Sequence, residues 1–146
     1  MTANEDIRRL LVKTEVFLHP DAFILVSIDR MHEGRARSLL LDLGAFSSIT
    51  FDLAEASLVV KESDWAELKE GFSDFEEEGP YRLITFDIVL DLSIVGFLAA
   101  ISARLAEEGI SIYALSTFLR DHILVKESDA ESAVAVLGGL IEECKT

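Results

Sequence analysis

The sequence predicts an α+β protein built from two ferredoxin-like βαββαβ units in tandem, with antiparallel sheets and helices on one face. The order strand, helix, strand, strand, helix occurs twice, and one extra strand precedes it. The pentapeptide VKESD occurs at residues 60–64 and again at 125–129, which indicates a duplicated unit. Two strands that meet in a hairpin between helices are typical of this architecture.

The first unit, expected over residues 10–75, contains weaker signals than the second. Apolar residues alternate over 10–18, and the apolar run at 23–28 suits a central strand. Pro20 is expected to separate these two strands, because proline cannot donate to a ladder. We expect a helix at 31–43, strands at 46–53 and 56–61, a helix from Trp65 capped by Ser63 or Asp64, and a solvated linker at 71–79.

The second unit, expected over residues 80–142, is denser. Its predicted elements are a strand at 81–90, a helix capped by Ser93 and ended by Gly109, strands at 110–117 and 122–126, and a helix after Ser128 or Asp129. Because the second unit ends in a helix, it lacks a closing strand. We therefore expect residues 10–18 to complete its sheet.

Charge and composition exclude several classes of protein. A formal net charge of −14 over 146 residues disfavours nucleic acid and anionic membrane surfaces, which attract clustered Lys and Arg. The first residues do not resemble a signal peptide, and no apolar run approaches the ~20 residues that span a bilayer. A cytoplasmic location follows as the expectation. Cys144 is the single cysteine, so an intramolecular disulfide is excluded.

The sequence contains no recognisable catalytic or cofactor motif. Neither a phosphate-binding loop nor a dinucleotide-binding glycine motif occurs. His19, His32 and His122 lie in three separate segments, which disfavours a metal site. His122 is expected to point to solvent or to Asp121. We expect the protein not to be an enzyme and to need no cofactor.

Two segments resemble the ACT domain, the amino-acid-binding module of metabolic regulation, and are most similar to its CASTOR-type tandem branch. The first is FSSITFDLAEASLVV at 46–60, and the second is SIVGFLAAISARLAEEGISIYALSTFLRDHILV at 93–125. The second contains Gly96, Gly-Ile-Ser-Ile at 109–112, Ser-Thr at 116–117 and Asp121 at the family's positions. In the first unit the helix is shorter, and Gly34 matches the expected glycine loosely.

This resemblance implies a free amino acid or similar small ligand held at the interface of the two units. The loop at 91–96 precedes a helix, and N–H groups at a helix N-terminus suit a carboxylate. Asp91 or Asp121 would accept hydrogen bonds from an amino group. The implied contact residues are Asp91, Ser93, Ile94, Val95, Gly96, Ser116, Thr117 and Asp121, faced by Ser57 and Leu58 of the first unit.

Each of these residues also has a purely structural interpretation. Gly96 suits close packing of helix and strand, Ser93 a helix cap, Asp121 a turn, and 116–117 ordinary strand residues. The resemblance shifts Gly96 and Asp121 towards a ligand role. It also implies a regulatory or sensor protein, with a homodimer and a regulated protein partner expected. The alternative is a protein-interaction or structural module with a degenerate ligand site.

Overall fold

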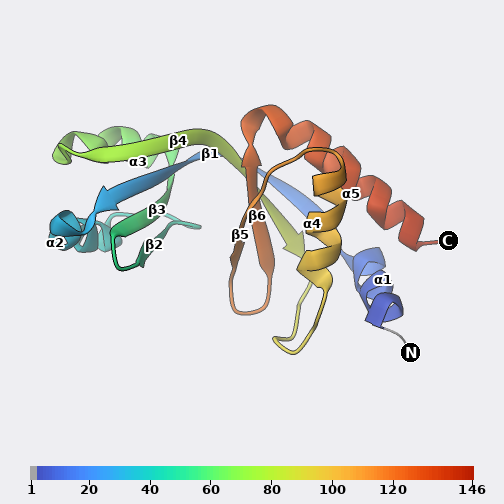
Figure 1. Ribbon diagram of the computed structural model, residues 1–146. Helices are drawn as coiled ribbons and strands as arrows, with labels where there is room; N and C mark the ends of the chain where they lie inside the picture. Colours follow the sequence, from blue (N-terminus) through green and yellow to red (C-terminus); the bar gives the residue numbers. More distant parts are fainter. Residues whose placement is uncertain (1–2) are drawn as a thin grey trace. The chain divides into compact units, whose positions relative to one another are not determined.

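The computed structural model describes residues 3–146 and has the predicted α+β architecture (Figure 1). The α-helices are α1 (Ala3–Lys13), α2 (Glu33–Ser38), α3 (Glu62–Leu68), α4 (Phe97–Glu107) and α5 (Ala130–Cys144). Short 3₁₀ helices are η1 (Arg30–His32), η2 (Leu39–Leu41), η3 (Lys69–Gly71) and η4 (Glu127–Asp129). The strands are β1 (Glu15–Asp29), β2 (Ser48–Phe51), β3 (Glu55–Lys61), β4 (Phe75–Asp87), β5 (Tyr113–Ser116) and β6 (Asp121–Lys126).

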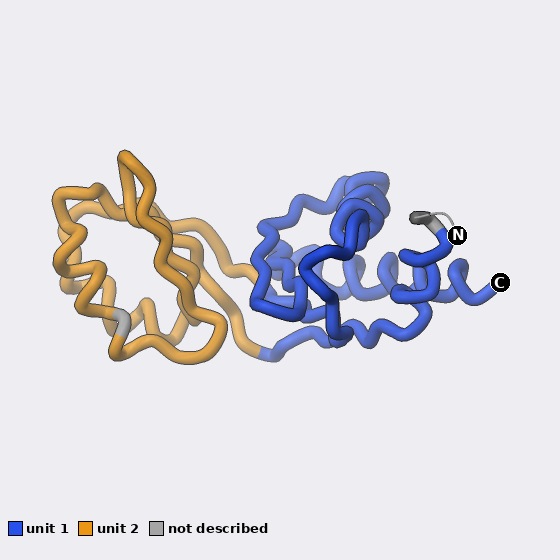
Figure 2. The backbone as a smooth tube through the Cα atoms, turned by 90° about the horizontal axis from the view of Figure 1, so that it is seen from below, with its two compact units in different colours: residues 1–20, 82–146 blue, residues 21–81 orange. Residues whose placement is uncertain are grey.

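The chain forms two compact units (Figure 2): unit 1 comprises residues 1–20 and 82–146, and unit 2 comprises residues 21–81. The strand order is β1-β4-β6-β5 in unit 1 and β2-β3-β1-β4 in unit 2. Unit 2 reads βαββαβ in chain order. Unit 1 has the same arrangement when β4 is counted first and the N-terminal part of β1, which precedes it in the chain, is counted last. The predicted fold class is therefore confirmed, including completion of the second unit by an N-terminal strand. The sequence-based unit ranges 10–75 and 80–142 stay a prediction.

Unit 1 has a continuous core beneath its three helices. On α4 the buried residues Phe97, Ile101 and Leu105 recur every four positions, which places them on one helical face. Helix α5 buries alanine and leucine in the same way, and α1 contributes Ile7 and Leu11. Burying each phenylalanine, isoleucine or leucine side chain stabilises the fold by about 1.5–3 kcal/mol. This core fixes the start of α4, where the candidate site lies.

Unit 2 has a smaller core centred on an aromatic cluster. Trp65 is 2% exposed, and its ring lies 5.8 Å from that of Phe72 and 5.1 Å from that of Phe75. The indole N–H donates to the carboxylate of Glu77, so the buried polar atom is satisfied. The helices of this unit are short. Helix α2 spans only Glu33–Ser38, which agrees with the prediction that the helix of the first unit is shorter.

The N-terminal segment differs from the prediction. Residues 10–13 belong to α1 rather than to a strand, because Ile7 and Leu11 bury one face of a helix. The Thr14 hydroxyl donates to the Leu10 carbonyl at the end of this helix. Strand β1 then runs through Pro20 without a break. The predicted interruption is therefore wrong.

Several other predicted boundaries are also wrong. The expected linker at 71–79 overlaps β4, which begins at Phe75 and places the exposed residues 76–78 in a strand. The same strand ends at Asp87 instead of residue 90. Helix α3 begins at Glu62 and so precedes its expected caps. The start of α5 was predicted correctly, because the helix begins at Ala130 with Asp129 at its N-cap position. Sheet pairing extends β4 at its N-terminal end beyond the apolar run, which a local turn signal does not reveal.

Candidate functional site

The loop that joins β4 to α4 in unit 1, residues 88–96, is organised by the carboxylate of Asp91. Its Oδ1 accepts hydrogen bonds from the hydroxyl of Ser93 (2.6 Å) and from the backbone N–H of Ser93 (2.8 Å). The backbone N–H of Ile94 donates to the carbonyl of Asp91 (3.0 Å). The Ser93 hydroxyl, and then its N–H, lower the pKa of Asp91, so an ionised carboxylate stands in the loop.

Gly96 ends this loop and is the N-cap of α4. Its φ of 98° and ψ of 0° lie in the left-handed region, where a residue with a Cβ is strained. An added Cβ would lie 3.7 Å from Ile7, so space does not require glycine here; the backbone conformation does. No side chain caps α4, which leaves the N–H groups of its first turn available to an anion. The prediction that Ser93 caps this helix is wrong, because Ser93 bonds Asp91 instead.

The hairpin of β5 and β6 forms the second wall. Ser116 pairs with Asp121, and the Ser116 hydroxyl donates to Asp121 Oδ1 (2.7 Å). The hairpin is tied to the loop by the backbone N–H of Leu90, which donates to the carbonyl of Leu119 (2.7 Å). The side chain of Arg120 donates to Asp87 at the end of β4 (3.0 Å). These bonds hold the loop and the hairpin in one arrangement.

Between loop and hairpin lies a hollow of about 280 Å³, at the lower end of the volumes of small-molecule pockets. Carboxylates of Asp91 and Asp121 and the cation Arg120 line it together with the first turn of α4. The remaining lining residues are apolar or hydroxyl-bearing: Leu90, Leu92, Ile94, Gly96, Phe97, Leu98, Ala99, Ser116, Thr117 and Phe118. Acceptors, one cation and helix N–H groups thus converge on a space of small-ligand size.

The structure brings six of the ten predicted contact residues to this hollow: Asp91, Ile94, Gly96, Ser116, Thr117 and Asp121. Ser93 and Val95 belong to the same loop but do not line the hollow. Ser57 and Leu58 lie on β3 in unit 2. Leu58 is 1% exposed in the core of that unit, and the Ser57 hydroxyl donates to Glu55 (2.8 Å).

Sequence reasoning missed Arg120 and a hydrogen-bonded chain behind the hollow. The Thr117 hydroxyl lies 2.9 Å from His122 Nε2, and His122 Nδ1 lies 2.9 Å from the hydroxyl of Thr85. The same Thr85 hydroxyl lies 2.7 Å from His19 Nε2. This series of hydrogen bonds crosses β6, β4 and β1. Because the residues that it joins on these strands lie far apart in the sequence, no local sequence pattern predicts their contact.

His122 is 3% exposed, so the expectation that it points to solvent is wrong. Burial, and then the neighbouring His19, lower the pKa of His122 below 6.5. A neutral imidazole has one donor and one acceptor nitrogen, which fits a hydroxyl on each side of the ring. The lining residue Thr117 is therefore held from behind by a neutral His122.

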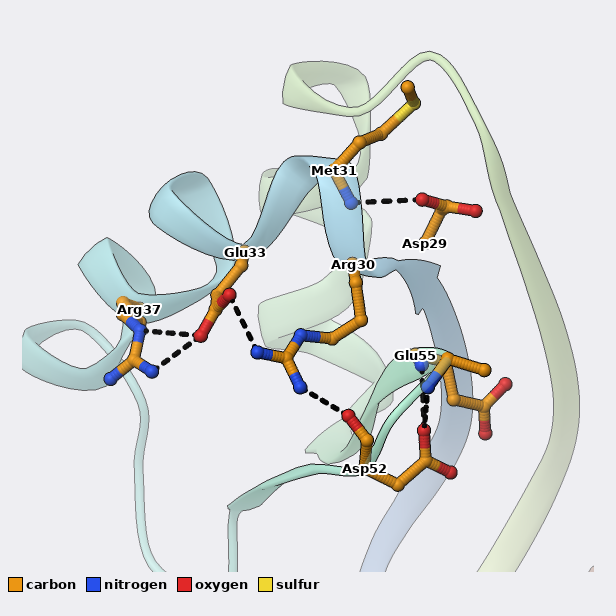
Figure 3. Close-up of polar contacts among 8 residues, drawn as sticks. Asp29, Arg30, Met31, Glu33, Arg37, Asp52 and Glu55 are labelled. Atoms are coloured by element: carbon orange, nitrogen blue, oxygen red, sulfur yellow. Dashed lines mark hydrogen bonds and ion pairs between the residues drawn. The ribbon is translucent and has the colours of Figure 1, made fainter.

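In unit 2 the turn after β1 is filled by charged side chains (Figure 3). The Arg30 guanidinium donates from Nη2 to Glu33 (2.8 Å) and from Nη1 to the carbonyl of Asp52. Arg37 Nε donates to the same carboxylate of Glu33 (3.1 Å). Both guanidinium groups lie over the ring of Phe51, 5.4 Å and 4.5 Å from its centroid. Arg37 first, and then Arg30, lower the pKa of Glu33.

Two other hollows are less suited to a specific ligand. One of about 610 Å³ between α1 and the end of α5 is lined mainly by long, exposed cations such as Arg9 and Lys13, whose ordering around a ligand costs entropy. One of about 310 Å³ in unit 2 is lined by carboxylates, including Asp29 and Glu76. Within residues 3–146, no group of three or more His, Cys, Asp or Glu side chains is placed to hold a metal. Over the same residues, no helix has the length and apolar character to cross a membrane.

Comparison with known proteins shows the same fold. A family model of the ACT domain matches residues 76–138, less than half of the chain but including the whole loop and hairpin. No curated protein matches the sequence.

Three solved structures are similar over nearly the whole chain. A protein of unknown function from Vibrio cholerae, described as a possible transport protein, is 22% identical with a TM-score of 0.76, covering 96% of this chain and 99% of that chain. A structure of aspartokinase alpha and beta subunits is 18% identical with a TM-score of 0.70, covering 88% and 98%. The ligand-free regulatory subunit of aspartate kinase from Thermus thermophilus is 14% identical with a TM-score of 0.66, covering 87% and 97%. Identities this low show a shared fold.

Proposed function

We propose that this protein binds a free amino acid in the hollow of unit 1 and reports its concentration to a partner protein. The observation that supports this most is the convergence of two carboxylates with the uncapped start of α4. The N–H groups of the first turn would take the ligand's carboxylate, and the helix dipole favours negative charge there. Asp91 and Asp121 would accept hydrogen bonds from its amino group.

The remaining parts of the proposal come from the ACT resemblance. Regulatory subunits of aspartate kinase are among the structural neighbours, and the matched family model covers the loop and the hairpin. We further propose the CASTOR-type tandem relationship, a non-enzymatic role, a cytoplasmic location and a homodimer. Light scattering of the purified chain tests the homodimer, and a monomer at all concentrations contradicts it.

A thermal-shift screen against the twenty amino acids at millimolar concentration tests the binding function. A ligand at about 100 times its Kd stabilises the folded state by about 2.7 kcal/mol, which raises Tm by several degrees. Asp121→Ala and the milder Asp121→Asn are expected to abolish the shift. Asp42→Ala, an exposed aspartate of unit 2, is the matched control and should keep it. Absence of a shift for all twenty amino acids refutes the amino-acid proposal.

One observation favours a second function, a protein-interaction module. Three large apolar side chains beside the hollow are mostly exposed: Leu92 (75%), Val95 (79%) and Phe118 (76%). Apolar groups gathered in this way mark contact surfaces. A chain that binds no amino acid but loses its partner or its dimer on Phe118→Ser would support this function instead.

A further inference from the structure

The two units can be matched residue by residue at the strand ends through equivalent backbone hydrogen bonds. In unit 1 the backbone N–H of Leu90 donates to the carbonyl of Leu119 (2.7 Å). In unit 2 the backbone N–H of Arg30 donates to the carbonyl of Ala54 (3.3 Å). In unit 1 the bond joins the loop after β4 to the hairpin turn, and in unit 2 it joins the residue directly after β1 to the hairpin turn. Arg30 therefore occupies the position of Leu90.

A second pair of bonds matches the hairpins themselves. The Thr117 N–H donates to the carbonyl of Arg120 (2.9 Å), and the Asp52 N–H donates to the carbonyl of Glu55 (3.0 Å). The repeated pentapeptide gives the same register, since residues 60–64 and 125–129 follow at the same distance. Asp52 thus corresponds to Thr117, which lines the hollow of unit 1.

Unit 2 has no counterpart of the open loop. In unit 1 residues 88–96 separate β4 from α4, whereas η1 begins at Arg30, directly after β1. Gly34 lies inside α2 and is not among the glycines with positive φ, unlike Gly96. The backbone that forms one wall of the hollow in unit 1 is therefore absent from this part of unit 2.

The Arg30 side chain lies where the hollow would be. It donates to the carbonyl of Asp52, the counterpart of Thr117, and to the carboxylate of Glu33 (Figure 3). The same guanidinium group lies 5.4 Å from the ring centroid of Phe51. Its Nε is buried and has no hydrogen-bond partner among the described residues, which is unfavourable. A carboxylate, a carbonyl and an aromatic face contact the same guanidinium group, and these are the groups that bind a planar cation.

We propose that unit 2 carries its own occupant at this position: the Arg30 guanidinium fills it, so the chain binds its amino acid in unit 1 alone. The statement about unit 1 rests on the proposed function, and the statement about Arg30 does not. The chain is thereby an asymmetric pair, with one unit open to a ligand and one closed by its own arginine. A free guanidinium compound should bind unit 2 once the arginine is removed.

Arg30→Ala tests this occupancy, with ethylguanidinium as the probe. The substitution is expected to lower Tm by about 3–8 °C, and millimolar ethylguanidinium should restore part of that loss. The matched control is Arg9→Ala, an exposed arginine of α1 whose side chain has no bond within residues 3–146. The Tm of wild type and of the Arg9→Ala control should not rise when ethylguanidinium is added. Equal shifts in all three proteins, or an Arg30→Ala variant as stable as wild type, overturn the proposal.

Arg30→Lys serves if the alanine variant does not fold. Lysine keeps the charge but lacks the planar fork that reaches Glu33 and the Asp52 carbonyl together. Its Tm should therefore fall below that of wild type and rise with ethylguanidinium. A lysine variant with wild-type Tm and no response to the probe overturns the proposal.

Amide NMR spectra of the full chain separate this inference from the proposed function. The probe is an equimolar mixture of the twenty amino acids. Shifts confined to residues 90–99 and 116–121 support both proposals. Shifts that also appear at residues 30–37 and 51–55 of wild type overturn the inference and leave the proposed function standing. No shift anywhere refutes the proposed function and the placement of its ligand, while the ethylguanidinium experiment still decides the occupancy by Arg30.

Discussion

Replacing Thr85 with valine removes one hydroxyl group from β4 and keeps the β-branched shape of the side chain. Thr85 is 8% exposed, and its hydroxyl lies 2.7 Å from His19 Nε2 and 2.9 Å from His122 Nδ1. The substitution therefore takes one hydrogen-bond partner from each of two ring nitrogens. The packing of the sheet is otherwise preserved.

The cost follows from these two bonds. A hydrogen bond in a folded protein contributes about 0.5–1.5 kcal/mol net, and a buried group that loses its partner costs about 1–3 kcal/mol. His122 is 3% exposed, so water cannot readily replace the hydroxyl. His19 is half-buried, so water can partly replace the lost hydroxyl and the cost at this residue is smaller. We expect Thr85→Val to lower the free energy of unfolding by about 1–3 kcal/mol.

Urea denaturation at neutral pH measures this loss as a lower midpoint with an unchanged m value. Thr50→Val is the matched control, because Thr50 is an exposed strand residue whose side chain has no hydrogen bond within residues 3–146. It should stay within about 0.5 kcal/mol of wild type. If Thr85→Val is no less stable than Thr50→Val, the hydrogen-bonded chain does not stabilise unit 1 as described.

Two further predictions concern the same unit. Because burial and then His19 lower the pKa of His122, against an opposing effect of Asp121, the folded state binds fewer protons than the unfolded state. The contribution of His122 to the free energy of unfolding should therefore be complete above pH 6.5 and decrease as the pH falls towards the folded-state pKa. Urea denaturation at several pH values should show a smaller decrease in stability for His122→Gln than for wild type. An equal decrease in the two proteins would contradict this assignment. Gly96→Ala should destabilise by about 1–2 kcal/mol through its left-handed backbone, whereas Gly34→Ala, inside α2 with open space around it, should be neutral or stabilising. Thermal melts that show equal effects for the two glycines would refute the strain at Gly96.

The candidate site shows which parts of a site are encoded locally. The ACT resemblance predicts that the loop at 91–96 and the turn at Asp121 form one wall of a pocket, faced by Ser57 and Leu58. The loop and the turn themselves leave local signals, because turn residues and strand ends are marked within a few positions. Arg120 carried no such signal, since its partner Asp87 lies on another strand. The cap of α4 was also assigned incorrectly. Ser93 is a favourable cap residue by type, but its hydroxyl bonds Asp91 in the folded loop.

The sequence by itself determined the duplicated α+β pattern, the faces of the long helices and the loop that precedes α4. These features depend on the periodicity of apolar residues and on turn chemistry, which act over a few neighbouring positions. Only the tertiary structure decided that β1 continues through Pro20 and that β4 includes residues 75–80, so that each strand serves both units. It also decided that the Arg30 side chain occupies the turn after β1, whereas the loop that ends at Gly96 borders a hollow. Such outcomes depend on which distant strand or side chain becomes a neighbour, and a local pattern contains no record of that choice.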